Sequence, residues 1–334
     1  MNCRFRPLSK RETRSRSIPE PVSTSPESRN KTVLTVDGLR WRSLFLQALR
    51  SFFFEQGFLE VDTPIRHLVS IPERHIEPLR CGDTFLQTSP ELAMKMLLAR
   101  GCQNIFQICH CFRKNEQGQR HLEEFTMLEW YRRDSDYNAL MDDCQDLLNH
   151  LFQRLKKEYT VEQSSLFSGV DLFPPWPRIS VHEAFARFCP VSLDAALKED
   201  LFDALLVHHV EPQLGKAQPC FLVDYPASLA SLARKKTQRP ELAERFELYI
   251  SGVEIANGFS ELTDADEQRQ RFHEEIASIR EQRGETFSMP DRFLNALPGI
   301  GTAAGIALGV DRLFMLCFGI EDIAQAVSFT SEEL

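Results

Sequence analysis

The stretch FRKNEQGQRHLEEFTMLEWY, residues 112–131, decides how this chain of 334 residues is interpreted. An apolar run, 104–112, precedes it, and after a polar loop a second run mixes apolar residues with Glu124 and Glu129. Two such runs joined by a short polar segment predict a β-hairpin. Charged groups lie at the end of the first strand, at Arg113, and within the second, where burying an unpaired charge is costly. We therefore expect this hairpin to hold a charged ligand.

The composition indicates a folded protein in a reducing compartment. Hydrophobic residues make up 43% of the chain and aromatic residues 10%. The net charge of −9 argues against a general nucleic-acid binder, whose surface is usually basic. Nine cysteines without a C-x-x-C pair indicate free thiols. No apolar run approaches the roughly 20 residues of a membrane span, and no signal peptide is recognisable. A cytoplasmic protein without membrane contact is expected.

The first 36 residues predict a disordered basic arm, because Arg, Ser and Pro dominate them and large apolar residues are few. From Asp37, a candidate N-cap, apolar residues recur at helical spacing as far as Gly57. A strand at 58–61 follows, and Pro64 ends it. This helix and strand fit either a dimer interface or a core position.

Further along the chain, apolar periodicity and turn residues predict a succession of helices and strands. Ser89 is a candidate cap for a short helix, and Ser251-Gly252 is a turn pair inside a hairpin. The second strand of that hairpin carries Glu254 within an apolar run, and Glu261 follows seven residues later. Two carboxylates near one strand end suit a hard divalent cation. The elements so predicted are strands at 85–87, 221–223 and 306–310, helices at 92–98, 137–151 and 267–283, short helices over 180–215 and a hairpin at 246–259.

The segment 299–312 predicts a strand followed by a helix that meets an anion. Gly309 lets a ligand approach the backbone closely. Arg312 lies at the start of the helix, against the helix dipole, and this placement favours an arginine that reaches an anion. The chain has neither a GxxxxGK[ST] loop nor a GxGxxG loop. Any nucleotide must therefore be held by arginine side chains and a metal.

Three stretches, in this order, resemble the motifs of the class II aminoacyl-tRNA synthetases. Residues 41–64 resemble motif 1, residues 106–131 motif 2 and residues 305–318 motif 3. The resemblance implies an α+β fold for residues 37–334, with an antiparallel β-sheet flanked by helices. The stretches TSPE (88–91), EFTMLEWY (124–131) and VEIANGFSELTDA (253–265) are similar to the lysyl-tRNA synthetases in particular.

Two features depart from the lysyl enzymes. Those enzymes carry an N-terminal anticodon-binding domain, for which the residues before 37 leave no room, and they have Gly where this chain has Ala307. An added methyl group reshapes a pocket wall. Both features resemble a truncated paralogous family that attaches (R)-β-lysine to a lysine of elongation factor P. The resemblance implies ATP and Mg²⁺ as cofactors, (R)-β-lysine or lysine and elongation factor P as substrates, a homodimer, and no stable tRNA binding.

The resemblance also implies roles for individual residues. Arg113 would grip the α-phosphate and the substrate carboxylate, and Arg312 would hold the γ-phosphate and cover the adenine. Phe125 would stack on the other face of the adenine, and His121 would help to hold the tail phosphates. The implied catalytic pair is Arg113 and Arg312; the ATP-binding set is Arg113, Asn115, Glu116, His121, Phe125, Glu254, Ile255, Gly309 and Arg312; the Mg²⁺ ligands are Glu254 and Glu261; and the amino-acid set is Ser89, Glu91, Tyr131, Glu261 and Ala307.

Motif 2 departs from the family pattern in its loop. Asn115 stands where the family has Glu, and Leu122-Glu123 stands in place of Asn-Pro. Two alternatives remain open: a free-standing amino-acid ligase such as an ammonia-dependent asparagine synthetase, and a non-catalytic paralogue that senses an amino acid. Glu91, Glu261 and Tyr131 favour a cationic side chain and count against the first alternative. Retention of Arg113, Glu254 and Arg312 counts against the second.

Overall fold

The computed structural model describes residues 34–158, 166–167 and 169–333. The predicted disordered arm therefore lies outside the described residues, apart from its last three. Residue 36 already belongs to the first helix, α1 (Val36–Glu55). Its N-cap is Thr35, whose hydroxyl accepts a hydrogen bond of 3.1 Å from the backbone of Gly38. The prediction of Asp37 as the cap was wrong by two positions; Asp37 lies in the first turn and pairs with Arg40 at 2.8 Å.

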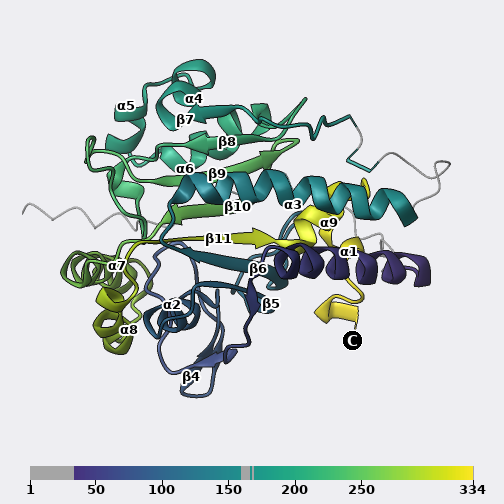
Figure 1. Cartoon of the computed structure of the whole chain (residues 1–334). Helices are drawn as coiled ribbons and strands as arrows, with labels where there is room; N and C mark the ends of the chain where they lie inside the picture. Colours follow the sequence, from purple (N-terminus) through teal and green to yellow (C-terminus); the bar gives the residue numbers. More distant parts are fainter. Residues whose placement is uncertain (1–33, 159–165, 168, 334) are drawn as a thin grey trace, which may run out of the picture. The chain divides into compact units, whose positions relative to one another are not determined.

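An eight-stranded sheet forms the centre of the fold (Figure 1). Its inner strands pair antiparallel, and only the two edge pairs, β1 with β5 and β7 with β8, are parallel. The predicted antiparallel sheet is thus confirmed for the inner strands. In spatial order the strands are β1 (Leu59–Glu60), β5 (Asn104–Phe112), β6 (Glu124–Arg133), β11 (Ala303–Gly309), β10 (Val253–Ser260), β9 (Arg245–Ile250), β8 (Cys220–Val223) and β7 (Arg178–Ser180).

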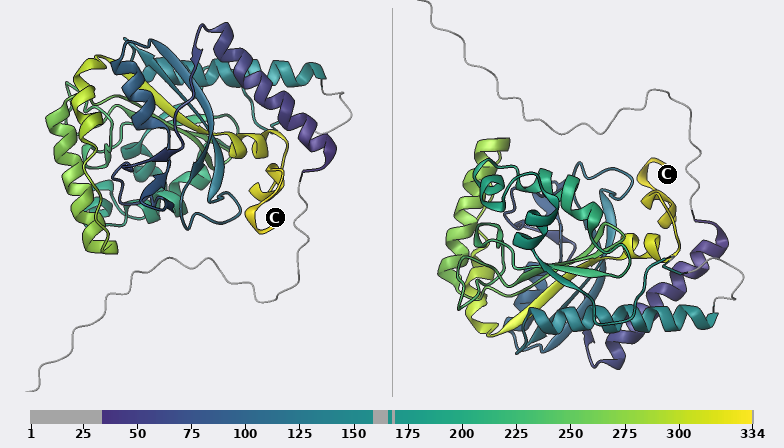
Figure 2. Two further views of the ribbon diagram at one scale, coloured as in Figure 1. Left: turned by 90° about the horizontal axis from the view of Figure 1, so that it is seen from below. Right: turned by 90° about the horizontal axis from the view of Figure 1, so that it is seen from above.

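Helices cover both faces of this sheet. On one face α1 packs beside α3 (Tyr137–Glu158), as Figures 1 and 2 show. Side chains alternate along β5 and β6: Phe106 and Trp130 face α1 and α3, whereas Ile105 and Tyr131 belong to the opposite core. That opposite core also contains α2 (Glu91–Ala99), α7 (Ala265–Arg283) and α8 (Asp291–Ala296). Tyr131 therefore indicates which face of the sheet carries the candidate site.

The remaining elements complete the two ends of the sheet. A small sheet next to the start of α2 contains three strands, in the order β2, β4 and β3. A third core packs the short helices of the predicted 180–215 segment against β8. The bounds of the remaining strands and helices are β2 (Arg66–His67), β3 (Arg80–Cys81), β4 (Thr84–Leu86), α4 (Val181–Phe188), α5 (Leu193–Lys198), α6 (Phe202–Leu205) and α9 (Val310–Cys317). The short π or 3₁₀ helices are η1 (Leu206–Val210), η2 (Glu211–Gln213), η3 (Ala227–Leu229), η4 (Leu297–Gly299), η5 (Ile323–Ala326) and η6 (Ser331–Glu333).

The two predicted hairpins are both present. The strand at 104–112 has the predicted bounds, and Ser251-Gly252 turns β9 into β10 with positive φ angles of 52° and 75°. Such angles are typical of tight hairpin turns. Within the described ranges, no helix combines the length and the apolarity that crossing a membrane requires.

Candidate active site

Arg113 lies immediately after β5, where the hairpin loop fixes its position. Its backbone N–H donates to the carbonyl of Glu123 at 2.9 Å, and its guanidinium lies 5.2 Å from the centroid of the Phe125 ring. The side chain meets Glu116 at 3.7 Å and is about one quarter exposed. The Arg113 cation lies over an aromatic ring, and its ion pair with Glu116 is weak. It therefore remains available to an anionic ligand. Arg113, Glu116 and Phe125 are thus brought together, as the resemblance implies.

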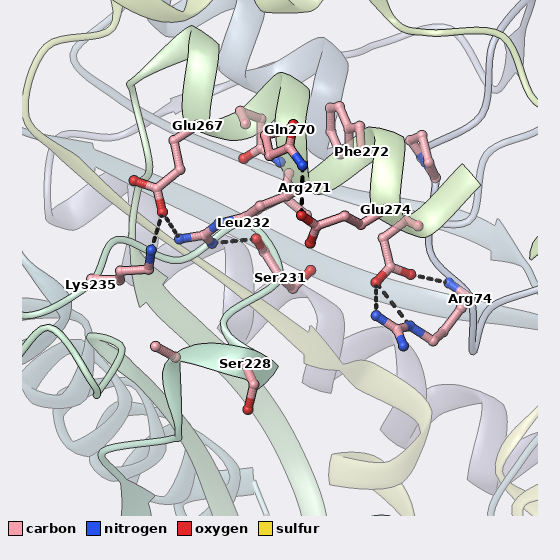
Figure 3. A pocket seen from close by; sticks show the side chains of 14 residues that line it. Arg74, Ser228, Ser231, Leu232, Lys235, Glu267, Gln270, Arg271, Phe272 and Glu274 are labelled. Atoms are coloured by element: carbon pink, nitrogen blue, oxygen red, sulfur yellow. Dashed lines mark hydrogen bonds and ion pairs between the residues drawn. The ribbon is translucent and has the colours of Figure 1, made fainter. Parts of the chain in front are cut away.

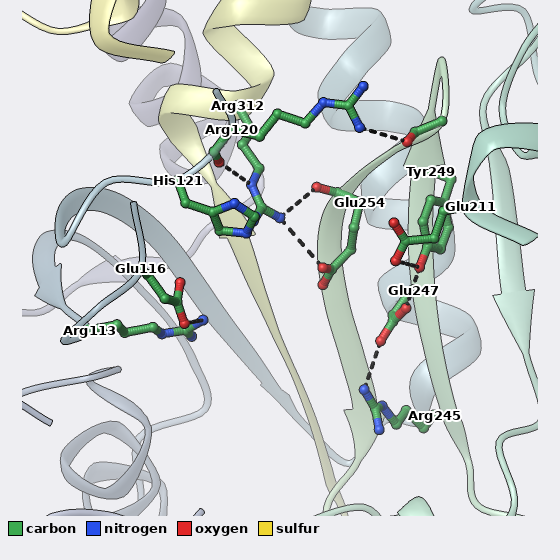
Figure 4. A network of polar contacts seen from close by, with 11 residues as sticks. Arg113, Glu116, Arg120, His121, Glu211, Arg245, Glu247, Tyr249, Glu254 and Arg312 are labelled. Atoms are coloured by element: carbon green, nitrogen blue, oxygen red, sulfur yellow. Dashed lines mark hydrogen bonds and ion pairs between the residues drawn. The ribbon is translucent and has the colours of Figure 1, made fainter. Parts of the chain in front are cut away.

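Arg312 gathers a second group of predicted residues (Figure 4). It lies in the first turn of α9 and donates to the backbone carbonyl of Glu254 at 3.1 Å, with the carboxylate of Glu254 3.5 Å away. Its Nη2 lies 2.6 Å from Nε2 of His121. Burial and the positive charge of Arg312 lower the pKa of His121 to about 4. Neutral His121 therefore accepts a hydrogen bond from Arg312 near neutral pH.

Asp311, the residue next to Arg312, fixes the first turn of α9 in place. One carboxylate oxygen of Asp311 pairs with Arg42 of α1 at 2.5 Å, and the other accepts from the backbone of Thr126 at 2.7 Å. Because α1, β6 and α9 meet at this buried carboxylate, Arg312 projects from a rigid point. Gly309 lies three residues before Arg312, and a side-chain carbon there would be in ordinary van der Waals contact with the Arg312 side chain, at 3.6 Å.

Two predicted nucleotide contacts, Ile255 and Asn115, have other neighbours in the structure. The side chain of Ile255 is buried in the hydrophobic core on the α3 side of the sheet, so the prediction that it lines the nucleotide site is wrong for the side chain. The amide of Asn115 donates to Glu77 at 3.0 Å. Asn115 also has a positive φ of 64°, a conformation that Asn adopts more readily than most residues. The left-handed backbone conformation at this position of the hairpin loop therefore explains why an Asn occurs there.

The structure separates the two members of the predicted Mg²⁺ pair. Glu254 lies at the start of β10 and Glu261 just beyond its end, and at about 3.3 Å per residue a strand separates residues seven apart by roughly 23 Å. Glu247, on the neighbouring strand β9, lies closer to Glu254 than Glu261 does. Glu254 pairs in register with Tyr249, and Glu247 lies two residues before Tyr249 on the same strand. Figure 4 shows the Glu247 carboxylate at the hydroxyl of Tyr249 and the Glu254 carboxylate on the side of Arg312.

The electrostatics of Glu247 also indicate that it lies near Glu254. Burial and the negative charge of Glu254 raise the pKa of Glu247. Glu247 accepts hydrogen bonds of 2.7 Å from Arg245 and from Tyr249. Among the described residues no group of three or more His, Cys, Asp or Glu could hold a metal by itself. Two carboxylates that repel each other nevertheless fit Mg²⁺, which takes its other ligands from phosphates and water.

Three carboxylates, from Glu91 of α2, Glu129 of β6 and Glu261 just beyond β10, form a largely buried group, which we call the acid cluster. Lys95 of α2 joins two of them: its Nζ lies 2.5 Å from Glu91 and 2.5 Å from Glu261. Glu129 accepts from Ser89 at 2.8 Å and from Tyr131 at 2.5 Å. The predicted amino-acid residues Ser89, Glu91, Tyr131 and Glu261 are therefore brought together.

The strand β11 forms the floor of the acid cluster. Ala307 pairs with Glu129 on one side and with Asn257 on the other, so its methyl group adjoins the cluster as predicted. Gly305 pairs with Tyr131. Burial, as the largest cause, and the charge of Glu91 raise the pKa values of Glu129 and Glu261 to about 8. The cluster is thus short of positive charge.

Sequence reasoning missed two members of the acid cluster. Glu129 was noted only as a charge that is costly to bury, and Lys95 was hidden in the apolar face of the predicted helix 92–98. The spacing of Glu91 and Lys95, four residues apart on a helix, is a signal for an ion pair. No sequence signal placed Glu261 against the same lysine.

A separate polar cavity of about 220 Å³ lies between α7, the segment 227–235 and Arg74 (Figure 3). Its charges pair with one another: Arg74 with Glu275 at 2.6 Å, and Glu267 with Lys235 at 2.8 Å and with Arg271 at 2.7 Å. None of the predicted site residues lines it. The catalytic candidates are therefore those of the two arginine groups and the acid cluster.

The chain is similar to known proteins along most of its length. Residues 29–333 match the family model described as tRNA synthetases class II (D, K and N). Among curated proteins, the chain is 39% identical over 312 residues to the elongation factor P–(R)-beta-lysine ligase of Salmonella gallinarum (strain 287/91 / NCTC 13346), and 38% identical to that of Salmonella typhi. Each alignment covers 89% of this chain and 95% of the relative. The chain belongs to the class II tRNA synthetase family of the D, K and N enzymes.

Proposed function

We propose that this protein is an ATP-dependent ligase that activates (R)-β-lysine as an adenylate and transfers it to a lysine side chain of elongation factor P. The acid cluster is the observation that carries the proposal. A buried group of three carboxylates recognises amines, and it lies beside an arginine that is free to meet a carboxylate. The relatives named for this reaction, which the chain matches over most of its length, support the identity of both substrates.

Adenylate formation in this site needs positioning more than proton transfer. The substrate carboxylate is already ionised when it attacks the α-phosphate and displaces pyrophosphate, so no general base is required. Arg113 neutralises charge that develops on the α-phosphate, and Arg312 holds the outer phosphates. Neutral His121 orients Arg312 without adding a proton. Glu254 with Glu247 would hold the Mg²⁺ that screens the phosphates.

Two alternative functions fit the site less well. The side-chain carboxylate of aspartate, the substrate of an asparagine synthetase, would be repelled by the acid cluster. A sensor without chemistry has no need for Arg312 held at once by Glu254 and His121. We also propose a homodimer, a cytoplasmic location and no stable tRNA binding. Free thiols at the eight described cysteines support the reducing compartment.

Pyrophosphate exchange with ATP tests the adenylation step. We expect exchange with (R)-β-lysine, weaker exchange with α-lysine and none with aspartate. Arg113→Ala should lower the rate on the order of 10²–10³-fold, because it removes a group that stabilises transition-state charge. Arg40→Ala, which alters an exposed ion pair on α1, is the matched control and should leave the rate unchanged.

Elongation factor P tests the transfer step. We expect its mass to increase by one β-lysyl group when it is incubated with the protein, ATP and (R)-β-lysine. Exchange with aspartate alone, or no exchange with either lysine isomer, would contradict the proposed function. Efficient charging of purified tRNA would contradict the absence of stable tRNA binding.

A further inference from the structure

We propose that Lys95 is a permanent counter-ion built into the acid cluster, and that its charge sets how many ammonium groups the amino-acid substrate must carry. This inference rests on the proposed function, because it assumes that the acid cluster binds the amines of the substrate. It makes Lys95 a positioning and specificity-determining residue for the activation step.

Lys95 is too deeply buried to interact with solvent. Its side chain is 1% exposed, and its Nζ lies 2.5 Å from carboxylate oxygens of both Glu91 and Glu261. The same nitrogen lies 5.0 Å from the centroid of the Phe259 ring. Lysine is almost never fully buried unless it is paired. Since its ammonium is enclosed by acids and an aromatic ring, its charge belongs to the pocket whether or not substrate is bound.

The number of charges then fits a diamino acid. With substrate bound and all three carboxylates ionised, Glu91, Glu129, Glu261 and the one ammonium of Lys95 leave two negative charges in the cluster. A lysine isomer brings two ammonium groups, while its carboxylate is matched by Arg113. Without Lys95 the cluster would carry three negative charges against two positive ones, and one buried carboxylate would lack a partner. Leaving a buried charge unpaired is strongly unfavourable.

The protons of the free cluster give this idea a measurable consequence. With pKa values near 8, Glu129 and Glu261 hold protons near neutrality, and the ammonium groups of the substrate must displace them. The amino-acid KM should therefore fall as the pH rises towards 8. The charge of Lys95 lowers both pKa values, so its removal should move this dependence to higher pH.

Several ionisable groups surround the lysine and contribute to this titration. Beyond the cluster itself, burial and the charge of Glu91 raise the pKa of Glu73, on the segment before β3, to about 7. The groups that face the cluster are Glu91 from α2, Glu129 and Tyr131 from β6, Glu261 from the end of β10, and Glu73 and Arg113 next to Glu91.

The test compares Lys95→Met with the wild type by pyrophosphate exchange between roughly pH 6 and pH 9, a range that brackets the carboxylate titration. Methionine keeps the length of the side chain without its charge. We expect the KM for (R)-β-lysine to rise about tenfold or more near pH 7.5, and the midpoint of its pH dependence to rise by about one unit. The KM for ATP should change less than about twofold, since Arg113 and Arg312 are untouched.

Lys236→Met is the matched control, because Lys236 is ion-paired with Asp224 at 2.5 Å, largely buried and outside the acid cluster. It should leave both KM values and the pH midpoint unchanged. If Lys95→Met gives no cooperative thermal transition, Lys95→Arg tests the same point: it keeps the charge, so the midpoint should remain at the wild-type value, and a displaced midpoint would overturn the proposal.

Two results with Lys95→Met would overturn the inference. An unchanged KM and midpoint would make Lys95 an ordinary structural ion-pair partner. A lower KM would mean that its ammonium competes with the substrate for Glu91 and Glu261. A wild-type protein that shows no exchange with either lysine isomer would instead refute the proposed function, so the two failures are distinguishable.

Discussion

At the scale of single residues, Gly305 leaves the least room for change. A side-chain carbon at this position would lie 2.2 Å from the ring of Tyr131 and 2.6 Å from a carboxylate oxygen of Glu261. Tyr131 is buried and held by Glu129, so it cannot move aside cheaply. We therefore expect Gly305→Ala to destabilise the fold by about 1–3 kcal/mol through overpacking. It should also raise the KM for the amino acid about tenfold, with little change for ATP.

Gly38→Ala provides the comparison for this prediction. The side-chain carbon that it adds lies 2.7 Å from the flexible end of Leu34 at the start of α1, far along the chain from the candidate site. Thermal melts and exchange kinetics should show no loss for this variant. If Gly305→Ala behaves like Gly38→Ala, the packing of Tyr131 against β11 does not control the substrate pocket.

At the scale of elements, β10 separates two functions. Glu254 at its start faces Glu247 and Arg312, whereas Glu261 beyond its end faces Lys95. Glu254→Gln and Glu247→Gln should each raise the Mg²⁺ concentration needed for half-maximal exchange by about tenfold. Glu261→Gln should instead raise the KM for the amino acid and leave the Mg²⁺ dependence unchanged. A Mg²⁺ defect in Glu261→Gln would restore the original pairing of Glu254 with Glu261.

The two hairpins show what the sequence could predict and what it could not. Apolar alternation and the Ser251-Gly252 pair are local signals, and they located β5, β9 and β10. The partner of Glu254 depends on which strand lies beside β10. Glu247 lies seven residues before Glu254 and Glu261 seven residues after it, and the sequence alone does not show which of the two carboxylates is its neighbour. Lys95 was missed for a related reason. Its two acids come from α2 and the end of β10, which are distant in sequence, and an isolated lysine on an apolar helix face gives no sign of them.

At the scale of the whole molecule, the segment resembling motif 1 and the residues directly after it leave apolar side chains exposed. Phe54 is 54% exposed, Leu59 58% and Leu68 77%, and Ile65 between them is also exposed. They come from one continuous stretch, which includes the short edge strand β1. An exposed apolar group next to an open strand edge is typical of an interface. We propose that a second copy of this chain covers it, in agreement with the dimer that the resemblance implies.

Light scattering coupled to size-exclusion chromatography measures this association directly. The wild type should elute with the mass of a dimer, and Phe54→Glu combined with Leu68→Glu should elute as a monomer, because two charges would be forced into an apolar contact. Val207→Glu is the control and should remain dimeric. Val207 is 50% exposed and lies in η1, near the end of the sheet opposite to β1. Since α1 fixes Asp311 through Arg42, the monomeric variant should also lose part of its exchange activity as α1 loosens. A double variant that stays dimeric would place the interface elsewhere, and a fully active monomer would show that α1 holds Arg312 in place without help from a partner.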